Sequence, residues 1–180
     1  MESGKKTMGP VGLGILSSLS ESYTLLPFMV YSSLISGQGG SVSFFIPVVI
    51  LYSIERACLI ALRGFGEIAN PYRILRNGLV IALIGSLLMV LSAFCRPLLA
   101  VSALFVGIGL SPMRAMFIPL SSRLIEENPG LKKGKAIGTL LYFAIMIAAL
   151  VLGKLSIHVV PVLFLLYIAA SAAIAFRLDG

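Results

Sequence analysis

The chain has 180 residues, of which 58% are hydrophobic and only 12% are charged, and its formal net charge is +7. A soluble domain typically contains about 25% charged residues, so this composition excludes an ordinary soluble globule and predicts a lipid bilayer as the solvent. The positive charge does not indicate a nucleic-acid partner, because the basic residues lie between apolar runs and not on amphipathic or aromatic-interleaved stretches.

Six apolar segments are long enough to cross a bilayer as helices, since one crossing needs about 20 mostly apolar residues. In chain order they are 11–35, 42–63, 78–95, 97–120, 136–153 and 157–176. A helix pairs its backbone polar groups within the segment, as the hydrocarbon core requires. We therefore expect an all-α polytopic membrane protein, a six-transmembrane-helix bundle that forms one transmembrane domain over residues 1–180.

The first segment, 11–35, is unusually polar for a crossing. Its polar residues are Ser17, Ser18, Ser20, Glu21, Ser22 and Thr24. Glu21 lies about ten residues, or roughly 15 Å, from the end of the helix and therefore near the middle of the bilayer. A glutamate without a cation partner in a low-dielectric cavity favours its neutral form and can carry a proton. Glu21 is thus our proton-coupling candidate, although these polar side chains could equally serve helix packing.

The second segment contains the adjacent pair Glu55 and Arg56, and the fourth contains Arg114 at a similar depth of roughly 10 Å. Charges at membrane depth usually face a cavity or one another. We expect Glu55 to pair with Arg114 and Glu21 with Arg56. The arginines could instead bind an anionic group of a substrate, or the charges could extend towards the membrane surface in a purely structural role.

The fourth segment also contains residues that weaken a straight helix. They are Gly107, Gly109, Pro112 and Pro119. Each proline removes a backbone donor and favours a kink, so these four positions are candidate gating hinges. An ordinary kinked helix is the alternative. The third and sixth segments contain no Asp, Glu, Lys or Arg and are expected to face lipid.

The loops predict the orientation of the chain. With the N-terminus in the cytoplasm, the basic residues inside would be Lys5, Lys6, Arg63, Arg73, Arg76, Arg123, Lys132, Lys133, Lys135 and Arg177, and those outside would be Arg96 and Lys154. Cytoplasmic loops carry an excess of Lys and Arg. We therefore expect both termini in the cytoplasm and the protein in the cell membrane.

Three stretches carry recognisable motifs in the same order as the predicted helices. After the second segment, GEIANPYRILR resembles a G-x-L-A-D-R-x-G-R-R loop, in which Gly66 matches, Asn70 replaces the aspartate and Arg73 supplies a basic residue. In the fourth segment, LFVGIG resembles R-x-x-x-G-x-G without its arginine. Before the fifth, EENPGLKKGKAIG resembles E-x-x-P…R-G-x-A-x-G, with Lys133 in place of the arginine.

These motifs, in this order, resemble those of one half of a major facilitator superfamily transporter. The resemblance implies a bundle of two three-helix units in inverted orientation, with helices 1 and 4 lining a cavity and helices 3 and 6 facing lipid. That family has twelve helices, so this chain would pair with a copy of itself or with another membrane subunit.

The expected function is therefore secondary transport of a small-molecule substrate by a homodimer, with coupling to protons through Glu21. The alternative is a non-transporting subunit or remnant half that associates with another membrane protein. We expect no enzyme, cofactor or metal site, because the sequence has no Asp-rich metal site, no Gly-x-Ser-x-Gly nucleophile and no histidine cluster.

Overall fold

The computed structural model describes residues 10–23, 26–37, 46–64, 71–117, 128–155 and 158–177, and these residues contain helices and no strands. The elements are α1 (Pro10–Ser22), α2 (Leu26–Gly37), α3 (Ile46–Gly64), α4 (Pro71–Leu91), α5 (Leu98–Pro112), the π-helical turn η2 (Met113–Phe117), α7 (Pro129–Leu155) and α8 (Val159–Phe176). The prediction of an all-α fold is confirmed for this part of the chain.

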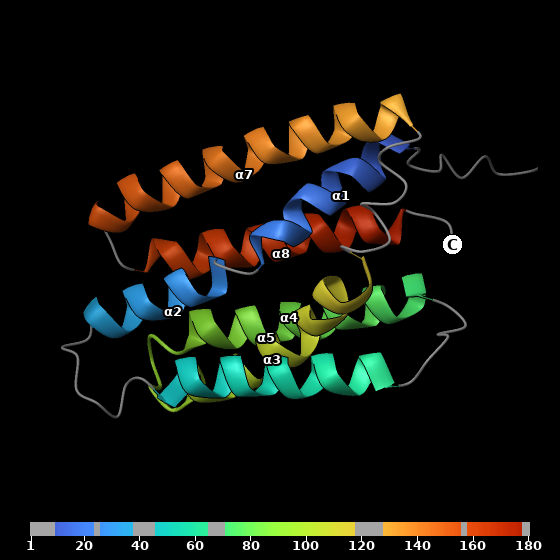
Figure 1. Ribbon diagram of the computed structural model, residues 1–180. Coiled ribbons are helices and arrows are strands. Elements are labelled where there is room, and N and C mark those ends of the chain that lie inside the picture. The colour runs from blue at the N-terminus through green and yellow to red at the C-terminus, as the bar shows by residue number, and fades with distance from the viewer. Residues whose placement is uncertain are drawn as a thin grey trace, which may run out of the picture.

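The helices form an elongated bundle in which the chain repeatedly reverses direction (Figure 1). Helix α1 packs along α7, α3 packs along α5, and α4 contacts both α5 and α8. Helix α2 continues in the general direction of α1 and contacts α3 and α8. The central element is thus the α4–α8 contact, with α1 and α7 on one side and α3 and α5 on the other.

The first predicted crossing, 11–35, is not one continuous helix, because α1 ends at Ser22 and α2 begins at Leu26. Pro27 lies in the first turn of α2 and has no N–H to donate to the carbonyl four residues earlier, at Tyr23. The N–H of Tyr23 instead bonds to the carbonyl of Ser20 at 3.2 Å, which closes α1 with a tighter turn.

Two other helices begin earlier than predicted. Helix α4 starts at Pro71 and not at residue 78, and α7 starts at Pro129 and not at residue 136. Proline is favoured in the first turn of a helix, where its missing N–H would have no partner. Arg73, which we expected in a loop, therefore lies in the first turn of α4. The motif positions Gly66 and Asn70 lie outside the described residues.

Three helices are long and apolar enough to cross a membrane in the part of the chain that the structure describes. They are Arg73–Leu91, Leu98–Ala115 and Val159–Phe176. Helix α3 has 19 residues but contains Glu55, Arg56 and Arg63, and three charges make its transfer into hydrocarbon costly. The three apolar helices are compatible with membrane insertion, whereas the six-crossing arrangement stays a prediction.

The bundle buries hydroxyl groups and exposes apolar side chains. Buried serines include Ser17, Ser20, Ser86, Ser102, Ser111 and Ser171. Most of them donate to a carbonyl one turn earlier, as Ser102 does to Leu99 at 2.9 Å. The exposed face of α4 carries Val80, Ile84, Leu87 and Leu91. Contiguous exposed apolar stripes of this kind are rare on soluble monomers.

Two helix crossings depend on glycine. A Cβ added at Gly134 of α7 would lie 2.1 Å from the carbonyl oxygen of Val11 on α1, and one added at Gly14 would lie 2.3 Å from that of Leu131. At the α4–α5 crossing, a Cβ at Gly109 would lie 2.4 Å from the backbone nitrogen of Ala82. Small residues allow helix backbones to approach this closely.

Candidate functional site

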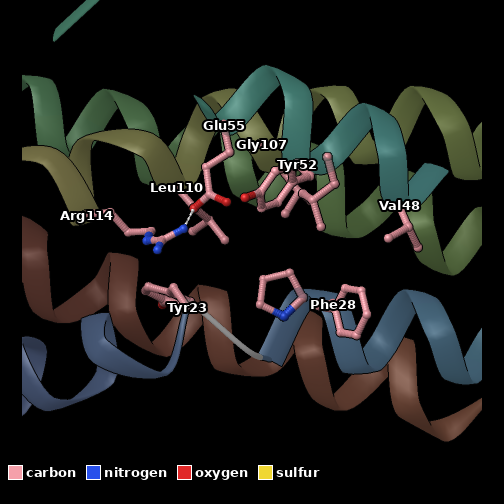
Figure 2. A pocket seen from close by; sticks show the side chains of 11 residues that line it. Tyr23, Phe28, Val48, Tyr52, Glu55, Gly107, Leu110 and Arg114 are labelled. Carbon is pink, nitrogen blue, oxygen red and sulfur yellow. Dashed lines mark hydrogen bonds and ion pairs between the residues drawn. The ribbon is translucent and has the colours of Figure 1, made fainter. Parts of the chain in front are cut away.

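A cavity of about 250 Å³ lies where the α1–α2 break faces α3 and the end of α5 (Figure 2). Its described lining consists of Tyr23, Pro27, Phe28, Val48, Leu51, Tyr52, Glu55, Val106, Gly107, Leu110 and Arg114. Most of this surface is apolar or aromatic, and one carboxylate and one guanidinium are its charged groups. In Figure 2, Tyr23 and Phe28 lie across the gap from Tyr52 and Glu55.

The lining residues follow the spacing of a helix face. On α3, Val48, Leu51, Tyr52 and Glu55 recur at intervals of three and four residues, which places them on one side of the helix. On α5, Leu110 lies one turn after Val106 and Gly107, and Arg114 continues the series into η2. The same periodicity is present in the sequence and could have identified Tyr52.

The cavity contains the ion pair that the sequence predicted, in which Nη1 of Arg114 donates to Oε1 of Glu55. The Arg114 side chain is 27% exposed and the Glu55 side chain 13%. A pair at this depth is less screened than one on an open surface, where the net gain is about 0–1 kcal/mol. The contact joins α3 to the π-helical turn and gives the apolar cavity one polar wall.

Arg114 reaches the cavity from an irregular segment. Pro112 is the last residue of α5, and η2 follows it directly. Proline leaves the carbonyl four residues earlier, at Ile108, without its usual helical donor. Single π-helical turns are frequent at functional sites. Pro119 lies outside the described residues.

On the opposite wall, hydrogen bonds hold the broken end of α1 in place. The Tyr23 hydroxyl donates to Oγ of Ser171 at 2.5 Å, and the Tyr167 hydroxyl donates to the carbonyl of Leu19 at 3.0 Å. Leu19 belongs to the last turn of α1, whose carbonyls lack helical donors. The rings of Tyr23 and Tyr167 meet edge to face, with centroids 5.4 Å apart. Sequence reasoning missed this tyrosine pair, because its members are distant along the chain.

Helix α2 is attached separately to the other side of the bundle. The hydroxyls of Tyr31 and Ser102, both buried, are 2.7 Å apart. These hydrogen bonds tie the end of α1 to α8 and tie α2 to α5.

The other predicted charged residues do not join this cavity in the described part of the structure. Arg56 is exposed, and its Nη2 donates to the Tyr52 hydroxyl at 3.1 Å while its guanidinium lies 5.3 Å from the Tyr52 ring centroid. Glu21 occupies the last turn of α1, but its side chain is not among the described ones. The expected pair between Glu21 and Arg56 stays a prediction, because the Glu21 side chain lies outside the described part of the structure.

The candidate hinge residues of α5 lie at close helix contacts. A Cβ at Gly107 would lie 3.2 Å from the carbonyl oxygen of Leu51 on α3, and Gly109 meets α4 more closely still. Pro112 lies beside Gly78 of α4, where an added Cβ would be 3.0 Å from its Cγ. The structure thus gives these residues a packing role, and the hinge role stays a prediction.

Comparison with known proteins finds no family model, no curated protein and no solved structure that matches this chain.

Proposed function

We propose that this protein is a secondary transporter that resembles half of a major facilitator superfamily transporter and acts as a homodimer. In this proposal the cavity beside the Glu55–Arg114 ion pair binds a small-molecule substrate. The observation that carries it is an ion pair in a mostly apolar cavity at a break in a helix. Discontinuous helices commonly form the binding sites of secondary transporters.

Part of the packing pattern supports two inverted three-helix units, although the extensive α4–α5 contact has only a small counterpart between α1 and α8. If the α1–α2 segment, α3 and α4 correspond to α5–η2, α7 and α8, the α1–α7 contact corresponds to the α5–α3 contact. Because α4 and α8 exchange places in this correspondence, the α4–α8 contact maps onto itself. In each unit the first crossing is irregular, through the α1–α2 break in one and the π-helical turn in the other.

The distribution of charge supports the proposed orientation. Helices α4 and α7 begin, and α8 ends, at one end of the bundle (Figure 1). The basic residues at these termini are Arg73, Arg76, Lys132, Lys133, Lys135 and Arg177. An excess of basic residues marks the cytoplasmic side, so this end, and with it both chain termini, would lie in the cytoplasm.

The cavity's size and chemistry restrict the substrate. A dry cavity of about 150 Å³ accommodates benzene, so a cavity of about 250 Å³ suits a molecule of roughly one substituted ring. Tyr23, Phe28 and Tyr52 offer aromatic surface to such a ring. Arg114 or Glu55 would pair with a charged substituent.

The exposure of Arg56 favours a protein partner that covers the α3 face. Arg56 is exposed near the middle of α3, where contact with hydrocarbon would be costly. A second copy covering α3 would remove this cost and close the cavity. A different membrane subunit would do the same, which is the alternative function of a non-transporting partner.

Transport can be tested with purified protein in proteoliposomes that enclose a pH-sensitive dye. We would add benzoate, benzylamine and benzyl alcohol separately under an imposed proton gradient and record solute uptake and luminal pH, each as the excess over protein-free liposomes, since the neutral forms of these solutes cross a bilayer unaided. Glu21→Gln should abolish coupled uptake while the protein stays folded in the membrane. Uptake at the wild-type rate by Glu21→Gln would exclude proton coupling through this residue.

The homodimer can be tested by native mass spectrometry from lipid nanodiscs. A mass of two chains supports two halves that enclose one pathway. A mass of one chain contradicts the homodimer and favours the alternative of a subunit for another membrane protein.

A further inference from the structure

A second cavity, of about 610 Å³, lies where the end of α4 meets the start of α8. Its described lining consists of Leu34, Met89, Val90, Ser92, Ala93, Phe94, Arg96, His158, Pro161 and Val162. None of these residues lines the cavity beside the ion pair. We call this second cavity the α4–α8 groove.

The polar end of the α4–α8 groove is positive. Arg96 lies in the turn between α4 and α5, and His158 directly precedes α8; both are exposed. The described lining contains no acidic side chain. His158 occupies the N-cap position of α8, so the partial positive charge at this end of the helix adds to the charge of Arg96. An anionic group is therefore the complementary ligand.

Apart from Ser92, the rest of the α4–α8 groove is lined by apolar residues, and exposed apolar residues continue along the bundle. Val90 and Val162 line it, and Leu87 and Leu166 lie about one turn further along α4 and α8. Both leucines are exposed, as is Phe94 at 89%. A soluble anion would leave this surface uncovered, whereas an acyl chain would cover it.

We propose that the α4–α8 groove binds an anionic phospholipid, with its phosphate beside Arg96 and His158 and an acyl chain along Val90 and Val162. The proposal rests on the membrane location of the bundle and not on transport. The basic pair lies at helix termini and the apolar residues lie within the helices, which is the order in which a lipid presents its headgroup and chains. A zwitterionic lipid would fit less well, because its ammonium group would approach the guanidinium of Arg96 and the positive end of α8.

The test is native mass spectrometry of the full chain from nanodiscs that contain equal amounts of phosphatidylglycerol and phosphatidylcholine. We expect the wild-type protein to retain phosphatidylglycerol preferentially. A basic residue near the membrane surface contributes about 1 kcal/mol to attraction of anionic lipid, so Arg96→Gln should reduce the preference about fivefold. Arg96→Lys keeps the charge and is the control for loss of folding. This variant should retain most of the preference for phosphatidylglycerol.

Two further variants separate the site from general electrostatics. Arg73→Gln removes an exposed charge from the opposite end of α4 and should leave the preference unchanged. Ala93→Phe fills the α4–α8 groove without changing its charge and should displace both lipids. Equal retention of the two lipids by the wild-type protein, or equal losses in Arg73→Gln and Arg96→Gln, would overturn the proposal. Complete displacement of phosphatidylglycerol by inorganic phosphate would also overturn it and indicate a site for a soluble anion.

Discussion

The α1–α7 and α3–α5 contacts, which would correspond to each other in the proposed inverted repeat, are built differently. At the first, Gly14, Gly134 and Gly138 allow the two backbones to touch, and Ser18 and Thr139 hydroxyls are 2.7 Å apart. At the second, Gly107 packs closely against Leu51. Further along α3 and α5, long side chains line the cavity and form the Glu55–Arg114 ion pair.

The difference teaches where the bundle can change shape. Contact between backbones leaves little freedom, because any outward movement loses many close contacts at once. Long side chains around a cavity can change rotamer while the helices move. We therefore expect movement on the α3–α5 side and a rigid α1–α7 side. Three sets of substitutions test how the two sides are held together.

The largest expected effect is from Gly134→Leu in α7. A Cβ at this position would lie 2.1 Å from the carbonyl oxygen of Val11, so the helices must separate along their contact. Overpacking typically costs 1–3 kcal/mol and occasionally more, and we expect about 3 kcal/mol, measured by thermal unfolding in detergent. Ala136→Leu is the matched control, because Ala136 is exposed on the same helix and should change stability by less than about 0.5 kcal/mol. Equal melting temperatures for the two variants would contradict the tight crossing.

An intermediate effect is expected from breaking the ion pair. Arg114→Leu leaves the carboxylate of Glu55, 13% exposed, without its cation. The cost should be about 2 kcal/mol, since an unpaired, largely buried group loses its compensation for desolvation. Replacing both residues by leucine should cost less than the single change, and the exchange of Glu55→Arg with Arg114→Glu should restore part of the stability.

Denaturation in detergent of the wild-type protein, Glu55→Leu, Arg114→Leu and the double leucine variant, compared as a double-mutant cycle, measures this coupling. A coupling energy near zero would mean that the pair does not stabilise the α3–η2 contact. The cavity would then depend on packing alone.

The smallest effect is expected from Ser18→Ala at the α1–α7 crossing. This variant loses the contact with Thr139, whose hydroxyl still donates to the carbonyl of Lys135 at 2.9 Å. Hydrogen bonds between membrane helices average about 0.6 kcal/mol, so the loss should be of that size in the same unfolding assay. A loss comparable to that of Gly134→Leu would show that polar contact, and not backbone approach, dominates this crossing.

Part of the site was predictable because it follows from local chemistry. Glu55 and Arg114 stood out as charges within apolar segments, and charges at such depth need partners, so their pairing could be anticipated. Tyr23 and Phe28 did not stand out, since aromatic residues in apolar segments usually pack in a core. Their position at the cavity depends on the break between α1 and α2. Pro27 in the first turn of α2 and the hydrogen bond from Tyr23 to Ser171 fix the location of this break.

The amino-acid sequence by itself determined the helical class, the apolar outer faces and the basic end of the bundle, because each depends on composition and on the chemistry of neighbouring residues. Only the tertiary structure decided which glycines meet a neighbouring backbone, that Arg56 turns to Tyr52, and that Arg96 and His158 share one groove. These relations join residues from different helices or select among rotamers, and packing fixes them through contacts that have no regular spacing along the chain.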